Sequence, residues 1–222
     1  MLQRLRIDWA NHIISFFSAL FGILIAFELD EWREQRNELE LARSAFENLK
    51  KEVNINQNIL HENVSLNLRT IEKVKEVLTR TDKNLLFTGT HQEADSINKK
   101  FGKLLLIDIS GVKGITSGWP LHIGLGNIIV PSLHTSAWES AKAIGALNFM
   151  PYEKVVSLSF VYNNSRINDE LNQIKSLLKN ADRIINKREV IQLLEEMERS
   201  HKALEAELVQ FDQFVNMLEV MD

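Results

Sequence analysis

The side chains that could bind a metal ion are scattered along this chain. Zinc sites often pair histidines at short helical intervals, as in His-x-x-x-His or His-Glu-x-x-His, and calcium loops space carboxylates closely. None of these spacings occurs in the sequence. We therefore predict no metal site and no cofactor; the alternative is a metal site assembled from distant residues. The histidines are His12, His61, His91, His122, His134 and His201.

Ser132, His134 and Ser136 come closest to a nucleophile with a neighbouring base. A catalytic serine of the hydrolase type stands in a G-x-S-x-G turn, and neither serine has that frame. Helix capping is the better interpretation, because serine is a preferred N-cap residue. The chain has no cysteine, which excludes thiolate zinc sites, disulfides and cysteine nucleophiles. We predict no catalytic residue and no enzyme; the alternative is an enzyme of a class without local motifs.

A glycine-rich stretch, GVKGITSGWPLHIGLG at residues 111–126, has the composition of a phosphate-binding loop. It lacks the G-x-x-x-x-G-K-[ST] spacing, and no G-x-G-x-x-G leads from a strand into a helix. The preferred interpretation is a turn-rich cap on helices. The competing interpretation is a ligand-binding sensor or enzyme, and it requires a deep pocket in the middle region. The residues expected to line that pocket are Trp119, His122, His134 and Glu139.

Composition favours a helical protein that binds no nucleic acid. The 222 residues include only three prolines and nine glycines, and 45% of them are hydrophobic. The formal net charge is -4 and no basic stripe is present, whereas phosphate binding needs clustered lysine and arginine. We therefore expect no nucleic-acid partner.

Residues 9–27 contain no charged side chain. As a helix this run would measure about 28 Å, close to the ~30 Å hydrocarbon thickness of a bilayer. A cleaved signal peptide would show a small-x-small cleavage site, which residues 25–28 lack, and a buried core helix seldom runs so long without a charge. We predict a transmembrane anchor over residues 1–32, with Trp9 and Trp32 at the two interfaces.

No glycine, proline or turn signal separates the apolar run from the charged residues after it. One helix should therefore leave the membrane and continue as a rod over residues 33–84, ending between Thr81 and Asn84. Apolar residues at seven-residue intervals predict a seam that packs against protein. Asparagines at later seam positions predict that the buried face drifts or that a new contact begins. The seam comprises Leu39, Ala42, Phe46, Leu49, Val53 and Leu60, and the asparagines are Asn56, Asn63 and Asn67.

Residues 151–222 carry the clearest helical pattern, with apolar positions at alternating steps of three and four. We predict two long helices that reverse direction near residues 182–187, with Asn186 and Glu189 as a capping box. They should form an antiparallel hairpin packed on the rod. Residues 85–150 are predicted as an irregular segment with a short strand at 103–110 and a short helix capped by Thr135 or Ser136. The predicted fold class is mainly α.

His201 falls on the predicted seam of the last helix. We predict a neutral imidazole in the helix interface, with a hydrogen bond at one side. Leucine at this position should then preserve or raise the melting temperature near neutral pH. The alternative is a pH switch.

Two short blocks carry a family resemblance. The first has the pattern GxLIA…W at the exit of the anchor, and the second has an aromatic residue and glutamate, then Gly-Ala-Leu, then a helix with a tyrosine. The matching residues are Gly22, Leu24, Ile25, Ala26, Trp32, Trp138, Glu139, Gly145, Ala146, Leu147 and Tyr162. With these residues the chain resembles the DUF6090-type family, bacterial single-span membrane proteins of unknown function. The resemblance implies a membrane-anchored helical domain of bacterial origin and no activity.

Small residues occupy one face of the predicted anchor. Small side chains let two membrane helices approach closely, so we expect contact with another membrane protein or a second copy; the alternative is that small residues are simply common in such helices. A short basic tail precedes the anchor and acidic residues follow it, which predicts a cytoplasmic N-terminus and a periplasmic helical domain at a bacterial inner membrane. The alternative is the opposite orientation, because Arg33, Arg36 and Arg43 also follow the anchor. The expected function is that of a membrane-anchored scaffold or accessory subunit. The small residues are Ser15, Ser18, Ala19, Gly22 and Ala26.

Overall fold

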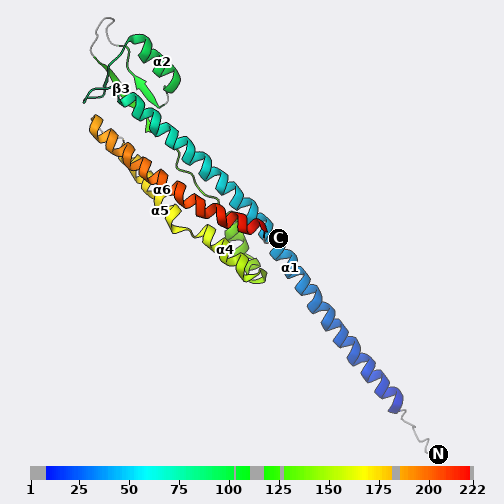
Figure 1. Ribbon diagram of the computed structural model, residues 1–222. Helices are drawn as coiled ribbons and strands as arrows, with labels where there is room; N and C mark the ends of the chain where they lie inside the picture. Colours follow the sequence, from blue (N-terminus) through cyan, green and yellow to red (C-terminus); the bar gives the residue numbers. More distant parts are fainter. Residues whose placement is uncertain (1–8, 103, 111–117, 126–127, 182–185, 221–222) are drawn as a thin grey trace, which may run out of the picture.

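The dominant element is α1 (Trp9–Leu78), an unbroken helix of 70 residues that measures roughly 105 Å at ~1.5 Å per residue. The predicted continuity between the apolar run and the charged rod is confirmed. Figure 1 shows the N-terminal part of α1 extending alone, whereas its C-terminal part joins the other helices. The computed structural model describes residues 9–102, 104–110, 118–125, 128–181 and 186–220.

The helix ends at Leu78, earlier than the predicted end between Thr81 and Asn84. Thr81 Oγ1 donates to the Leu78 carbonyl at 2.9 Å. Asp82 Oδ1 accepts from the backbone N–H groups of Asn84 and Leu86, both at 2.8 Å. These side chains satisfy backbone groups outside a helix, so the chain turns at this point.

The folded body, residues 38–220, is built around a helical hairpin, and we call it the head. α6 (Lys187–Val220) lies antiparallel to α1, because Gln57 donates to Asp212 whereas Lys75, further along α1, pairs with Glu198. α5 (Ser165–Ala181) packs along α6 in the opposite direction. The predicted fold class is therefore confirmed, with the C-terminal hairpin packed on the rod (Figure 1).

The buried face of α1 recurs at both seven-residue and eleven-residue intervals. Phe46, Val53 and Leu60 of the predicted seam are buried at steps of seven, and Leu49, Leu60 and Ile71 are buried at steps of eleven. Eleven residues in three turns keep an almost straight α-helix in phase with its neighbour, whereas a heptad requires a left-handed supercoil. Leu39 opens the predicted heptad seam but is 64% exposed, so the prediction is wrong at that position.

The predicted seam of α6 is confirmed at every position. Its buried residues are Val190, Leu194, Met197, His201, Leu204, Leu208, Phe211, Val215 and Leu218.

The first arm of the hairpin differs from the prediction, because it consists of α4 (Tyr152–Tyr162) and α5 with a break at Asn163 and Asn164. Asn164 Oδ1 accepts from the Ile167 N–H at 3.2 Å and caps α5. At the start of α6, Asn186 Oδ1 accepts from the Glu189 N–H at 3.1 Å, which is the N-cap half of the predicted capping box. The predicted turn lies partly outside the described residues, since 182–185 are not among them.

The middle segment is more regular than predicted. β1 (Leu86–Phe87), β2 (Leu105–Ile107) and β3 (Trp119–Ile123) form an antiparallel sheet in the order β1-β3-β2. β2 lies within the predicted strand at 103–110. The sheet sits at the end of the head farthest from the N-terminus (Figure 1).

The sequence analysis missed α2 (His91–Phe101). The Thr90 side chain accepts from the Glu93 N–H at 3.3 Å, and the Glu93 carboxylate accepts from the Thr90 N–H at 2.7 Å. This is a capping box, and the Thr-x-x-Glu spacing in the sequence was the signal that could have predicted it.

An extended segment, residues 128–135, connects the sheet region to the base of the head, and we call it the strap. It leads into α3 (Ser136–Ala143) and the 3-10 helix η2 (Ala146–Phe149). Gly145 between them has φ 71, a left-handed conformation that favours glycine. α3 is the short helix that the sequence predicted.

Candidate functional site

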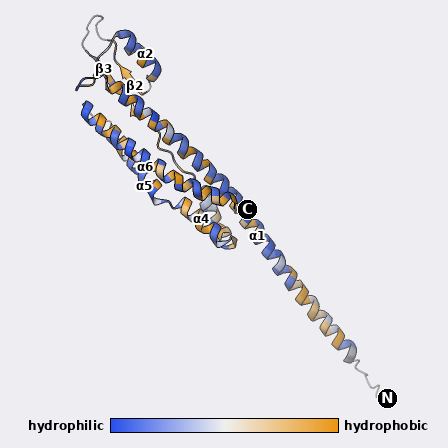
Figure 2. Cartoon of the chain, viewed as in Figure 1, coloured by the Kyte–Doolittle hydropathy of each residue, from blue (hydrophilic) through white to orange (hydrophobic). Residues whose placement is uncertain are grey.

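The N-terminal part of α1 is an apolar surface that no other described element covers. Every residue from 11 to 37 is exposed. In the part of the chain that the structure describes, α1 alone is long and apolar enough to cross a membrane, and none of its most apolar stretch is buried. A helix in the core of a soluble protein would be covered by its neighbours. Figure 2 shows hydrophobic residues along this projecting part of α1.

The predicted contact residues Ser15, Ser18, Ala19, Gly22 and Ala26 lie on the side of α1 that faces away from the head; we call them the small face. Gly22 is 27 residues before Leu49, a buried residue that faces the head. This separation is about seven and a half turns of a helix, which places the two residues on opposite sides. The same interval links the other members to buried residues: Ser15 to Ala42, Ser18 to Ala45, Ala19 to Phe46 and Ala26 to Val53.

The small face also has room for a neighbour. A Cβ atom added at Gly22 would meet no atom within 4 Å. A larger side chain at this position therefore causes no clash inside the chain, and any effect of such a substitution would come from a partner.

The residues expected to line a ligand pocket are not brought together. Trp119 and His122 lie in β3, whereas His134 lies in the strap and Glu139 on α3. The Trp119 ring packs edge to face against the His91 ring, with the ring centroids 5.8 Å apart. A cavity of about 600 Å³ includes His122 and a separate one of about 320 Å³ includes His134. Among the cavities seen in the described residues, none is lined by all four.

Glu52 is a buried carboxylate that joins α1 to α3 and α4. Its Oε2 atom accepts from Ser136 Oγ at 2.7 Å and from the Ala137 N–H at 2.9 Å. Its Oε1 atom accepts from the Tyr162 hydroxyl at 2.8 Å and from the Trp138 N–H at 3.4 Å. The rings of Trp138 and Tyr162 stack with centroids 5.0 Å apart, so Trp138 packs on the ring whose hydroxyl binds the carboxylate.

The carboxylate of Glu52 takes the place of a local cap on α3. Thr135 occupies the N-cap position but makes no side-chain cap bond, so the predicted cap at Thr135 or Ser136 is wrong. An anion at a helix N-terminus is favourable, because the first N–H groups of the helix have no partners within it. Burial alone would raise the pKa of Glu52, but the bonds from its four donors lower that pKa below the ordinary value of 4.5.

Asn56 and Asn67 hold the strap against α1. Asn56 Nδ2 donates to the His134 carbonyl and its Oδ1 accepts from the His134 N–H, both at 2.8 Å. Asn67 bonds both backbone groups of Ile129 in the same way, at 2.8 and 3.1 Å. Eleven helical residues and five extended residues both span roughly 16 Å, so the two pairs are in register.

The roles of Glu52, Asn56 and Asn67 in holding α3 and the strap against α1 were not predicted from the sequence. Asn56 and Asn67 were noted as asparagines at seam positions, and Glu52 precedes the seam residue Val53. A buried polar side chain needs a partner, so a polar residue in an apolar seam was the available signal. The local pattern around these residues does not indicate that the partner is the strap or α3.

His201 is 1% exposed and uses both ring nitrogens. Nδ1 lies 2.7 Å from the Met197 carbonyl, and Nε2 lies 2.9 Å from Asn67 Nδ2. Because Asn67 Nδ2 is a donor, Nε2 accepts and Nδ1 carries the proton. The imidazole is therefore neutral, as predicted, but it is bonded at both sides rather than one.

Replacing His201 with leucine should therefore lower stability, contrary to the prediction from the sequence. His201→Leu leaves an Asn67 N–H without an acceptor, and we expect a loss of about 1–2 kcal/mol in the free energy of unfolding at pH 7.5. Thermal unfolding followed by circular dichroism measures this loss. An unchanged or higher melting temperature would restore the original prediction.

The same residue should make stability depend on pH. Burial lowers the pKa of His201 below its ordinary value of 6.5. Above pH 6.5 the histidine is unprotonated in both the folded and the unfolded state, so the stability that neutral His201 contributes is fully present. Below pH 6.5 the unfolded state binds a proton before the folded state does, so the free energy of unfolding falls. The melting temperature should thus decline from pH 7 toward pH 5 more steeply in the natural chain than in His201→Gln. If the melting temperature fell equally steeply with pH in both proteins, His201 would not be the cause of the pH dependence.

Comparison with known proteins identifies no family for this chain. No family model, curated protein or solved structure matches the chain. The resemblance to the DUF6090-type family thus stays a prediction.

Proposed function

We propose that this protein is a membrane-anchored scaffold or accessory subunit that acts by binding other proteins. The observation that carries the proposal is the exposed apolar part of α1, which continues without a break into a well-packed head. In water this surface would be unfavourable, whereas a bilayer covers it over about the right length. A rigid connection would hold the head at a fixed place above the membrane.

The proposed location is the bacterial inner membrane, with a cytoplasmic N-terminus and a periplasmic head. The bacterial origin rests on the family resemblance. The orientation rests on Arg4 and Arg6 before the apolar run and on the acidic residues after it. Protease treatment of intact spheroplasts tests it, because a periplasmic head would be digested and a cytoplasmic head would be protected.

The anchor is tested by placing charge in the apolar run. Each arginine near the centre of a membrane helix costs about 2.5–3.5 kcal/mol of insertion free energy. We expect the natural chain to stay in the membrane pellet after alkaline extraction and the double variant Phe17→Arg with Phe21→Arg to be released. Ile55→Arg on the exposed side of the head is the control and should stay in the pellet. Release of the natural chain itself would contradict the anchor.

The small face is tested by substitutions that block close approach. Gly22→Leu and Ala19→Leu should weaken co-purification with a membrane partner or self-association, because small residues permit backbone packing between helices in lipid. Leu20→Ala is the matched control on another side and should have little effect. A second measurement uses single cysteines in native membranes. Crosslinking through Ser15→Cys and Gly22→Cys that is no stronger than through Phe17→Cys and Leu24→Cys would show the face to be wrong.

A further inference from the structure

A cavity of about 610 Å³ lies between α1, the C-terminal end of α2 and the strap, and we call it the α1/α2 cavity. Small-molecule sites in proteins have volumes of roughly 300–1,000 Å³ and combine apolar walls with a few polar groups. The α1/α2 cavity has both kinds of lining. Its apolar side chains include Leu66, Phe101, Leu104 and Ile129, and its charged side chains include Lys73 and Lys100.

The apolar lining comes from separate segments that meet at the cavity. Leu66 on α1 is 49% exposed and Ile129 on the strap is 47% exposed. A single exposed apolar side chain is common on protein surfaces and needs no explanation. Here two of them border one cavity together with Phe101 at the end of α2. The cavity can therefore cover the apolar part of a small molecule.

Two lysines from different helices lie beside the same aromatic ring. Lys73 Nζ on α1 is 5.8 Å from the centre of the Phe101 ring, and Lys100 Nζ on α2 is 5.0 Å from it. Within the described residues neither ammonium group has an ion-pair or hydrogen-bond partner. A lysine in the last turn of α2 compensates the helix dipole, but Lys73 belongs to α1 and has no such role there. The two ammonium groups thus have donors available for a ligand.

The acids near the cavity leave these two lysines unpaired. Asp95 pairs with the neighbouring Lys99, with Oδ2 and Nζ 2.7 Å apart. Glu62, Glu72 and Glu76 lie on the same part of α1, yet none of them lines the cavity or forms an ion pair with Lys73 or Lys100 in the part of the chain that the structure describes. The charge that borders the cavity is therefore positive.

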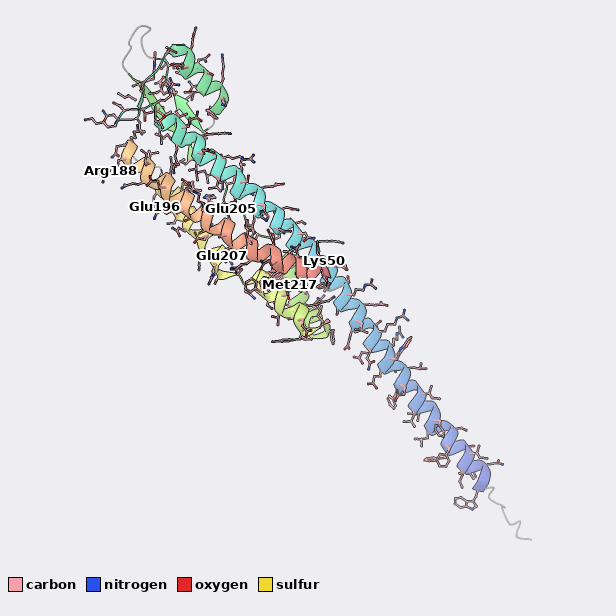
Figure 3. The ribbon with its side chains drawn as sticks, in the orientation of Figure 1. Lys50, Arg188, Glu196, Glu205, Glu207 and Met217 are labelled. Atoms are coloured by element: carbon pink, nitrogen blue, oxygen red, sulfur yellow. The ribbon has the colours of Figure 1, made fainter. Side chains whose placement is uncertain are left out.

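The acidic helix α6 lies on the other side of α1. Lys75 pairs with Glu198 of α6, and Lys73 is two residues earlier, roughly 200° around the helix. Figure 3 shows Glu196 on α6, with α2 across α1 from it. The chain as a whole has a net charge of -4, whereas residues 96–107 contain three lysines and no acid. Positive charge is thus concentrated at the α2 side of the head.

We propose that the α1/α2 cavity binds a small amphipathic anion. Its apolar part would pack on Leu66 and Ile129, and its anionic group would lie between Lys73 and Lys100, because these contacts match the two halves of the cavity. A membrane lipid does not reach this site. Lys73 is 41 residues beyond Trp32, roughly 60 Å along α1 from the membrane interface; this step alone rests on the anchoring proposed above. The ligand is therefore a soluble molecule of the compartment that contains the head.

Lysine acylation followed by mass spectrometry tests the site on the full chain in native membranes. The probe is 2-naphthoate, and its control is 2-naphthamide, which has the same rings without the charge. We expect 2-naphthoate to slow the labelling of Lys73 and Lys100 several-fold and to leave exposed Lys179 on α5 unchanged. Equal protection by 2-naphthamide, or equal protection of Lys179, would overturn the proposal. So would protection of the purified chain by phosphatidylglycerol vesicles and not by 2-naphthoate.

A matched pair of variants tests the apolar half of the cavity. Leu66 and Ile55 are 49% and 50% exposed and lie eleven residues apart, so they are on the same side of α1. Leu66→Glu places an acid beside the bound anion and should abolish protection by 2-naphthoate, whereas Ile55→Glu should keep it. The helical circular dichroism signal should be unchanged in both, and full protection in folded Leu66→Glu would contradict the site.

The cationic half is tested by Lys73→Gln. Removing one exposed charge should weaken the affinity for 2-naphthoate, followed by the protection of Lys100, by about fivefold. Lys179→Gln is the control and should not change it. Unchanged affinity in Lys73→Gln would show that Lys73 does not bind the anion. Protein that is found in the soluble fraction and still shows the protection would overturn the anchoring and leave the binding site.

Discussion

Glu52→Gln is expected to lower the free energy of unfolding by about 3 kcal/mol. The carboxylate accepts four hydrogen bonds, from Ser136, Ala137, Trp138 and Tyr162. A glutamine has the same shape but offers one acceptor oxygen, and its NH₂ group would face N–H or O–H donors. Bonds to a charged acceptor contribute more than neutral bonds, and donors left unpaired in a buried site add their desolvation cost.

The measurement is chemical or thermal unfolding of the full chain in detergent, followed by circular dichroism. Glu47→Gln on the same helix is the matched control, because Glu47 is exposed, and it should change the free energy of unfolding by less than about 0.5 kcal/mol. Tyr162→Phe removes only one donor and should cost about 1 kcal/mol. A loss below about 1 kcal/mol for Glu52→Gln would show that the carboxylate does not hold α3.

The sign of the pH dependence follows from the direction of the pKa shift. The pKa of Glu52 is lower in the native state than its ordinary value of 4.5. Its contribution is therefore fully present above about pH 4.5 and is lost as the pH falls through the native pKa. In Glu52→Gln this part of the acid destabilisation should be absent, so the two proteins should differ most in stability at neutral pH and least in acid.

Periodicity predicted those parts of the fold that depend on one helix at a time. All nine seam positions of α6 are buried, because a long helix with one apolar stripe has only one way to cover it. The continuity of α1 was also predictable, since no residue between Gly22 and Gly89 is a glycine or a proline. The error at Leu39 arose because this residue lies next to the exposed residues 11–37, and a seven-residue pattern does not show where the packed part of a helix begins.

Contacts between distant segments were not predictable in the same way. Glu52 and Ala137 are 85 residues apart, and the sequence around either residue does not indicate that the two are in contact. The first arm breaks at Asn164, because the side chain of this residue caps α5. The apolar spacing is the same on both sides of the break, so periodicity alone did not show it. That the small-face residues share one side of α1 could be predicted, because they lie on a single helix; the contact they would make stays a prediction.

Asn67→Leu is the second substitution with a large expected effect, about 3–4 kcal/mol in the free energy of unfolding. Asn67 bonds the N–H and the carbonyl of Ile129 and also Nε2 of His201. Leucine suits the surrounding apolar seam, so the loss would come from three unpaired groups and not from a cavity. Asn63→Leu is the control, because Asn63 bonds only its own helix at Ile59 and is half-buried. Hydrogen exchange should show the Ile129 N–H losing protection in Asn67→Leu and keeping it in Asn63→Leu.

A double variant separates the contribution of the strap from that of the histidine. His201→Leu alone leaves one Asn67 N–H unpaired, whereas in Asn67→Leu with His201→Leu both members of that pair are gone. Removing both partners of a buried hydrogen bond costs less than the two single losses added together. The double variant should therefore be more stable than additivity predicts by about 1 kcal/mol, yet still less stable than His201→Leu, because Ile129 has lost both of its bonds. Strict additivity would mean that Asn67 and His201 do not interact, and that the strap is held by other residues.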